Sequence, residues 1–141
     1  MNTTLHVARF TAAYWCVLIV SLLPLLCAVL AKRGSFGKPR REGGYDNHNP
    51  RAWLARQTDW RARANAAQAN SFEALPFFIG AVVIAHQLGA AQTLLDLLAF
   101  LFVLLRVFYI MMYVADMPTV RSAVWGAGFL VNIAILFIGY R

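Results

Sequence analysis

Residues 10–31 form an uninterrupted apolar segment without a single charged side chain. At a rise of 1.5 Å per residue, a helix of this length is about 33 Å long, enough to cross about 30 Å of bilayer hydrocarbon. A signal peptide would have a shorter apolar region with positive charge before it, whereas here Lys32 and Arg33 follow the segment. The segment therefore predicts a membrane-spanning helix.

The composition agrees with a membrane environment. Hydrophobic residues make up 60% of the chain and charged residues 13%, against about 25% charged residues in soluble domains. The formal net charge of +7 could indicate a nucleic-acid-binding protein. However, nine of the thirteen Lys and Arg residues lie between Lys32 and Arg63, flanked by apolar segments. This distribution is typical of membrane topology, so nucleic acid is not an expected partner.

Three further apolar segments follow the first one. The second, residues 59–88, has a short apolar part that is extended backward by a run of alanines, which favour helix. Together the segments predict an all-α membrane protein with a single domain, residues 1–141. We expect a four-transmembrane-helix bundle with helices at about 10–31, 59–88, 94–115 and 119–140 and a loop at 32–58.

The basic loop sets the expected orientation. The positive-inside rule places residues 32–58 in the cytoplasm and both termini in the periplasm, as in a multi-pass protein of a bacterial inner membrane. Within this loop, residues 51–57, with Trp53 and the nearby Trp60, predict a short helix at the membrane interface.

Polar side chains at membrane depth are costly, so each needs a partner or a function. The second helix carries Arg63, Asn70 and Glu73 on one face. A structural ion pair between Glu73 and Arg106 of the third helix is one interpretation. In the other interpretation, these groups lie close together on the loop side of the membrane. They then form a polar pocket for an anionic ligand that is open to the cytoplasm. The further members of this set are Arg106, Tyr109 and Tyr113 on the third helix, Arg121 on the fourth, and Lys32 and Arg33 at the end of the first.

Motifs of soluble enzymes are absent from the sequence, and its histidines (His6, His48 and His86) lack the spacing of metal ligands, so no metal site is expected. Asp96 and His86 are expected at the interface opposite the loop, where they could pair with each other. Any chemistry therefore has to come from the membrane-embedded polar set.

Much of the polar set lies within two motifs. The second helix contains N-x-x-E-x-x-P at Asn70, Glu73 and Pro76, and the third contains R-x-x-Y-x-x-x-Y, which begins at Arg106 and ends at Tyr113. With four spans and a long first loop, the chain resembles the MAPEG family, the membrane-associated proteins in eicosanoid and glutathione metabolism. Within this family it resembles the microsomal glutathione transferases, as a bacterial-type member.

The resemblance implies a homotrimer that binds glutathione as co-substrate between neighbouring subunits, near the cytoplasmic face. It implies a catalytic role for Arg121, which would favour the thiolate of glutathione. The residues that it implies for glutathione binding are Arg63, Gln68, Asn70, Glu73, Arg106, Tyr109 and Tyr113.

One position departs from the family pattern. Ala66 stands where the family usually has an arginine, four residues before the motif asparagine, and Arg63 lies one turn earlier as a substitute. The leading hypothesis is a glutathione transferase or peroxidase that acts on lipophilic small molecules from the surrounding lipid, with a role in detoxification. The departure favours the alternative, a non-catalytic membrane binding or structural subunit. A small transporter is a third alternative, against which the absence of broken helix pairs argues.

Overall fold

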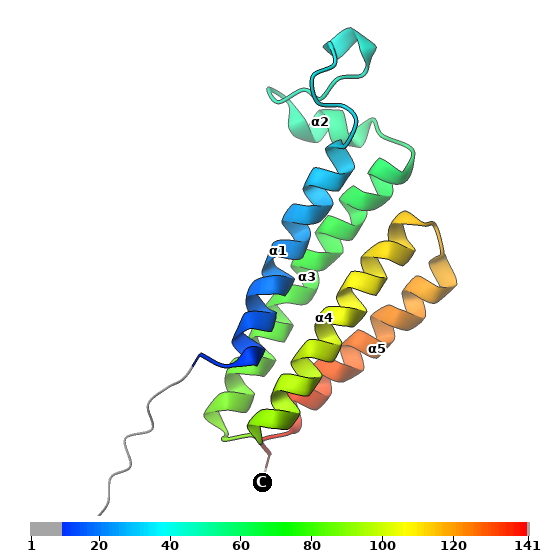
Figure 1. Cartoon of the computed structure of the whole chain (residues 1–141). Coiled ribbons are helices and arrows are strands. Elements are labelled where there is room, and N and C mark those ends of the chain that lie inside the picture. Colours follow the sequence, from blue (N-terminus) through cyan, green and yellow to red (C-terminus); the bar gives the residue numbers. More distant parts are fainter. Residues whose placement is uncertain (1–9, 141) are drawn as a thin grey trace, which may run out of the picture.

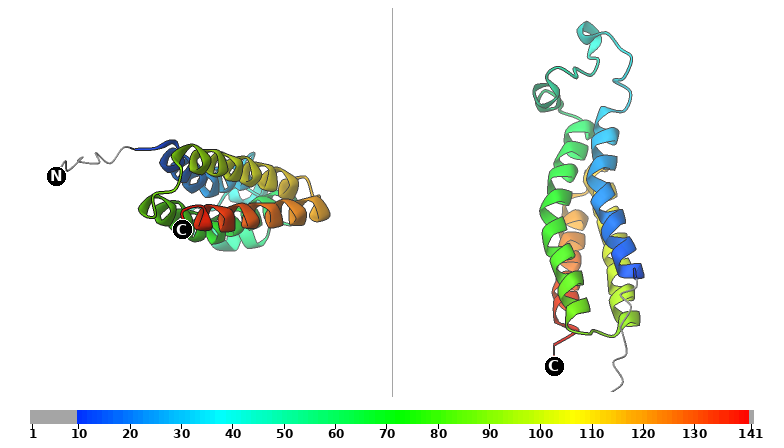
Figure 2. Two further views of the ribbon diagram at one scale, coloured as in Figure 1. Left: turned by 90° about the horizontal axis from the view of Figure 1, so that it is seen from below. Right: turned by 90° about the vertical axis from the view of Figure 1, so that its left-hand side faces the viewer.

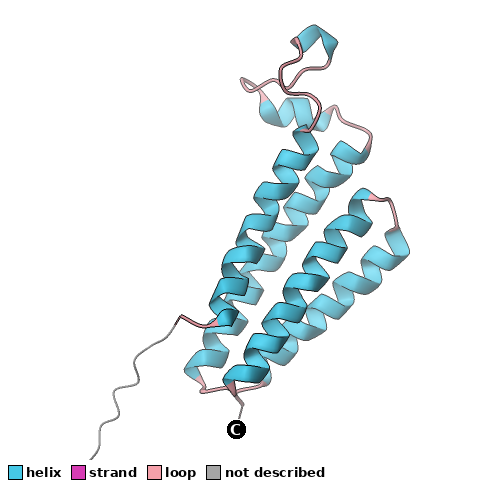
Figure 3. Cartoon of the chain, viewed as in Figure 1, coloured by secondary structure: helices cyan, strands magenta, loops and turns pink. Residues whose placement is uncertain are grey.

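The computed structural model of the chain describes residues 10–140, and every regular element among them is helical (Figure 3). Four of the helices are long and apolar enough to cross a membrane, which confirms the predicted all-α, four-span fold. The predicted periplasmic termini, with His6, fall on residues 1–9 and 141, outside the described residues. The elements are α1 (Ala12–Lys32), the 3-10 helix η1 (Arg40–Glu42), α2 (Pro50–Ala55), α3 (Trp60–Gln87), α4 (Gln92–Val114) and α5 (Pro118–Phe137).

The four long helices lie roughly side by side in one bundle (Figures 1 and 2). Helix α1 packs along α3, α4 packs along α5, and α3 contacts both α4 and α5. Residues 33–59, which carry η1 and α2, project from one end of the bundle, here called the loop end. The α3–α4 turn, the start of α1 and the end of α5 lie at the opposite end.

Local sequence signals explain where the long helices begin and end. The side chain of Thr11 accepts a hydrogen bond from the backbone N–H of Tyr14 at the start of α1, and Asp59 caps α3 in the same way. Pro118 opens α5, where its missing N–H costs nothing. Gly89, at φ 68°, ends α3 in the left-handed conformation that glycine adopts without strain.

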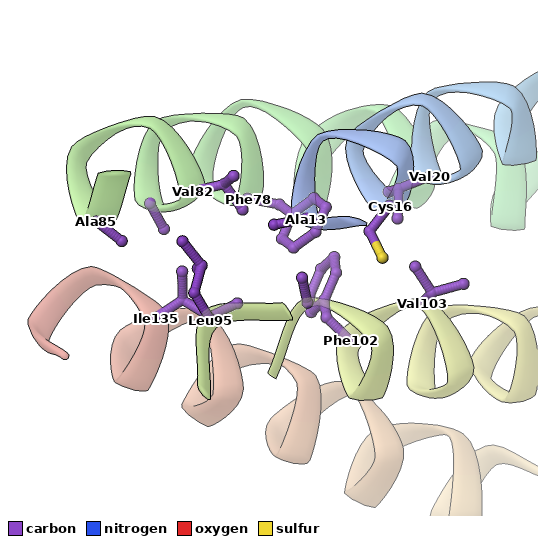
Figure 4. Close-up of a cluster of buried hydrophobic side chains, with 12 residues drawn as sticks. Ala13, Cys16, Val20, Phe78, Val82, Ala85, Leu95, Phe102, Val103 and Ile135 are labelled. Atoms are coloured by element: carbon purple, nitrogen blue, oxygen red, sulfur yellow. The ribbon is translucent and has the colours of Figure 1, made fainter. Parts of the chain in front are cut away.

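The core near the opposite end combines two stacked aromatic rings with small residues (Figure 4). The ring centroids of Phe78 and Phe102 lie 4.3 Å apart at 19°. Ala13, Ala85 and Ala99 are fully buried around them. Small side chains let helix backbones approach closely, so these positions determine the spacing of the helices. Such close packing is what holds helices together in lipid, where no hydrophobic effect acts between them.

Asp96 and His86 do lie at the opposite end, but the structure shows no hydrogen bond between them. An Asp96 carboxylate oxygen accepts from the backbone N–H of Ala13 at 2.8 Å. His86 Nδ1 lies 2.8 Å from the Val82 carbonyl, and Nε2 lies 2.9 Å from the Thr11 hydroxyl. Asp96 thus satisfies a free backbone N–H group in the first turn of α1, and His86 contacts the side chain of Thr11, the residue that caps this helix. The expected pairing of the two side chains is wrong for this reason.

The loop has a small core of its own. Trp53, at 3% exposure, is buried, its ring packs against Tyr45 at 5.3 Å, and its indole N–H donates to the Gly43 carbonyl at 3.4 Å. The Trp53 indole therefore packs inside the loop and does not face the membrane interface with its ring, while the interfacial position of the short helix stays a prediction. The short helix itself forms at Pro50–Ala55.

Candidate functional site

Three helices bring the predicted polar residues together in the half of the bundle nearest the loop end. Helix α3 supplies Asn70 and Glu73, one turn apart, and α4 supplies Arg106. The two helices are in contact along the bundle. Tyr109 and Tyr113 follow Arg106 at helical spacing on α4, and Arg121 lies in the first turn of α5.

Arg106 lies at the centre of this group and is only 4% exposed. Its Nη2 donates to Asn70 Oδ1 at 3.0 Å and to Ser71 Oγ at 3.4 Å. Its Nε is buried and has no hydrogen-bond partner. No carboxylate among the described residues forms an ion pair with it. The guanidinium is therefore a buried cation without a counterion, an arrangement that costs several kcal/mol unless an anion compensates it.

Asn70 connects this cation to a carboxylate. Its Oδ1 accepts from Arg106, while its Nδ2 donates to Glu73 Oε2 at 3.2 Å. Glu73 itself is exposed on the surface of the chain. The direct Glu73–Arg106 ion pair considered above does not form, because Asn70 stands between the two charges and the carboxylate turns outward. One side of the site thus offers a free positive group and the other an accessible negative group.

The two tyrosines extend the site toward the turn between α4 and α5. The Arg106 guanidinium lies 4.3 Å from the ring centroid of Tyr109, and the rings of Tyr109 and Tyr113 meet edge to face at 5.7 Å. The Arg121 guanidinium in turn lies 4.2 Å from the Tyr113 ring centroid. Each cation is attracted to an aromatic face. The Nε of Arg106 stays free, and the Arg121 side chain forms no hydrogen bond with the described residues, so both guanidinium groups keep donors that can bind an anion.

Arg63 is placed differently from the other predicted residues. Its Nε donates to the Val114 carbonyl at 3.0 Å, and its Nη1 lies 3.7 Å from Asp116 Oδ2. Val114 ends α4, and Asp116 follows it with φ 60°. A cation at a helix C-terminus satisfies free carbonyl groups and interacts favourably with the helix dipole. Arg63 therefore connects α3 to the α4–α5 turn, which directly precedes the first turn of α5 with Arg121.

This contact predicts a loss of stability in Arg63→Ala. We expect the free energy of unfolding in detergent to fall by about 1.5–3 kcal/mol, the range for a hydrogen bond from a charged group. Asp116→Asn should cost less, because Asn also tolerates the left-handed conformation and only the exposed ion pair is lost. Denaturant unfolding of both variants measures the difference. Equal losses would show that the ion pair, and not the Val114 carbonyl contact, holds the turn.

Of the residues predicted for glutathione binding, Gln68 is the one for which the structure shows neither a side-chain hydrogen bond nor a cation–π contact with the described residues. It is half-buried on α3. Ala66, also half-buried, leaves its part of the site without a cation.

Sequence reasoning missed two residues that the structure includes. Ser71 and Asp116 contact Arg106 and Arg63 respectively. Ser71 had a signal, a hydroxyl beside Asn70 at membrane depth. The role of Asp116 depends on the shape of the turn, which the residue types alone do not encode.

Comparison with known proteins agrees with this geometry. The MAPEG family, as a sequence model, matches residues 12–140, nearly the whole chain. No match was found among curated proteins or among solved structures. The matched range contains all four spanning helices and every residue of the site. The chain is an integral, multi-pass membrane protein that belongs to the MAPEG family.

Proposed function

We propose that the chain is one subunit of a homotrimeric glutathione transferase or peroxidase of the bacterial inner membrane. Its substrates would be lipophilic electrophiles or hydroperoxides that enter from the lipid, and its glutathione would enter from the cytoplasm. The observation that carries the proposal is the state of Arg106, a buried guanidinium with a free Nε and no counterion. Its burial is explained if the protein binds an anion there.

The chemistry of glutathione fits this site. The tripeptide carries two carboxylates and one ammonium group at neutral pH. Arg106 would bind one carboxylate through Nε and its remaining donors, because a guanidinium holds a carboxylate through two parallel hydrogen bonds. The exposed carboxylate of Glu73 would accept from the ammonium group. Asn70, Tyr109 and Tyr113 would complete the binding surface with Gln68 and Arg63 as outer contacts.

Arg121 would act on the thiol. A thiol with a pKa of about 8.5 becomes a better nucleophile beside a cation, because the positive charge favours the thiolate. The guanidinium is held over Tyr113 at 4.2 Å, at the end of the site that faces the α4–α5 turn. In this proposal the chain supplies proximity and thiolate stabilisation.

This role predicts a split between binding and rate in Arg121→Gln. Glutathione affinity should change little, while the conjugation rate at neutral pH should fall by roughly 100-fold, as when a group that stabilises developing negative charge is removed. The rate should recover partly at higher pH, where the thiol ionises without help. A pH–rate profile measures this. A rate loss of equal size at every pH would assign Arg121 a structural role.

The trimer is proposed from the exposure of Glu73. The face of α3 around it also exposes Phe72 at 49% and Pro76. A carboxylate at membrane depth is costly against lipid, so a neighbouring subunit is the expected cover for this face. Mass measurement of the purified protein in detergent tests the trimer directly. A monomer that still binds glutathione would contradict it.

A non-catalytic membrane binding or structural subunit is the second candidate, and one observation favours it. Ala66 lacks the family's usual cation, and Arg63, its expected substitute, is engaged with Val114 and Asp116. Titration with glutathione, followed by an assay with a model electrophile, separates the two candidates. Binding with conjugation supports the enzyme, and binding without conjugation supports the non-catalytic subunit. In the same titration, Arg106→Gln removes the central cation of the site. Arg51→Gln is its matched control, because Arg51 is an exposed loop residue outside the site.

A further inference from the structure

Two apolar grooves meet on the outer face of α1 near the loop end. The first has a volume of about 430 Å³ and is lined by Leu26, Val29, Leu30, Arg33, Gly34 and Phe36. The second, also of about 430 Å³, lies between α1 and α4 and is lined by Leu23, Leu26 and Leu30 on one side and by Val107, Ile110 and Val114 on the other. Leu26 and Leu30 line both grooves and therefore form the ridge that separates them.

The first groove ends at a cation. Leu26, Leu30 and Arg33 follow one another at helical spacing, so their side chains lie on one face. Arg33 is the residue after α1, where the helix leaves the apolar layer, and its side chain is exposed. The apolar wall thus meets a guanidinium at the level where hydrocarbon gives way to lipid headgroups.

The charge of Arg33 is free to attract an anion. Residues 32–63 carry nine Lys and Arg residues against three acidic ones, Glu42, Asp46 and Asp59, a difference of +6. Those three carboxylates form ion pairs with Arg41, Arg40 and Arg61. Arg33 forms no ion pair with any of the described residues. The groove therefore has an apolar body and an unneutralised positive end.

We propose that the two grooves bind one anionic diacyl phospholipid from the leaflet at the loop end. One acyl chain lies on each side of the ridge formed by Leu26 and Leu30, and the headgroup phosphate contacts Arg33. Charge complementarity selects this occupant, because the basic loop attracts anionic lipid and Arg33 adds a charge-assisted hydrogen bond. None of the residues proposed for glutathione binding lines either groove, so this proposal does not depend on the proposed function.

Native mass spectrometry of the protein in detergent tests the proposal with phosphatidylglycerol and phosphatidylcholine of identical acyl chains. The wild-type protein should retain phosphatidylglycerol in preference. Arg33→Gln should lower this preference about tenfold, as expected for loss of a hydrogen bond to a charged group. Arg51→Gln and Arg56→Gln remove the same charge from exposed loop positions outside the grooves. At roughly 0.5 M salt, where diffuse attraction is screened, they should leave the preference unchanged.

A second variant separates the acyl chains from the headgroup. Leu30→Trp fills both grooves and should reduce retention of both lipids, while the bundle still folds. Equal retention of the two lipids by the wild-type protein would overturn the proposal. It would also be overturned if the loop controls lowered the preference as much as Arg33→Gln. A disulfide between two copies of Leu26→Cys would show that a second subunit covers the grooves instead, and would contradict the lipid assignment as well.

Discussion

Arg106→Met is expected to abolish glutathione binding and, at the same time, to raise the free energy of unfolding of the ligand-free protein. The wild-type guanidinium is 4% exposed and lacks a counterion among the described residues. Its replacement removes the cost of desolvation and fills a similar volume with an apolar chain. We expect a gain of roughly 1–4 kcal/mol, the range known for the replacement of buried ion pairs by apolar side chains of similar volume. Thermal unfolding in detergent and calorimetric titration measure the two effects.

This combination distinguishes a binding residue from a structural one. A structural Arg106 would stabilise the bundle through Asn70 and Ser71, so that Arg106→Met would lose stability. Ser71→Ala is a suitable control, because it removes a partner of Arg106 and leaves the charge in place. It should lower stability slightly and leave glutathione binding detectable. Destabilisation by Arg106→Met together with retained binding would contradict the proposed site.

Ala66→Arg is expected to strengthen glutathione binding by about 10- to 100-fold. The variant supplies the cation that the family usually carries at this position, and a charge-assisted hydrogen bond contributes about 1.5–3 kcal/mol. Ala66 is half-buried on the helix that carries Asn70 and Glu73, so the long side chain can reach the site without entering the core. Fluorescence or calorimetric titration against the wild-type protein measures the gain.

Asn65→Arg is the matched control for Ala66→Arg. It adds the same charge to the same turn of α3, about 100° around the helix from residue 66. If it strengthens binding as much, the effect is general electrostatic attraction and not a specific contact. If neither variant strengthens binding, then Arg63 already supplies the cation that is missing at position 66, despite its contact with Val114.

The fold could be predicted from the sequence because the membrane leaves few alternatives. Backbone groups in hydrocarbon must be satisfied within the segment, so apolar length alone identifies a helix. The segment at 10–31 became α1 at Ala12–Lys32, and the alanine-rich start of the second segment became the first turns of α3 at Trp60–Gln87. Helical spacing also placed Asn70, Glu73 and Arg106 in one half of the bundle.

The remaining details depend on side-chain reach and turn geometry, which spacing does not encode. Periodicity brings Glu73 and Arg106 to the same level but cannot show that Asn70 bridges them. The ion pair of Arg63 with Asp116 depends on the shape of the α4–α5 turn, in which Asp116 adopts the left-handed conformation. Trp53 was expected at the interface from its residue type, and its burial follows from contacts within the loop that have no periodic signal.

The most direct test of the central claim, that the half of the bundle nearest the loop binds glutathione through Arg106, is calorimetric titration of the purified protein with glutathione. The comparison proteins are Arg106→Gln and Ala66→Arg. We expect saturable binding to the wild-type protein, loss of binding in Arg106→Gln and tighter binding in Ala66→Arg. Absence of binding to the wild-type protein up to millimolar glutathione, with binding gained in Ala66→Arg, would contradict the claim and favour the non-catalytic subunit.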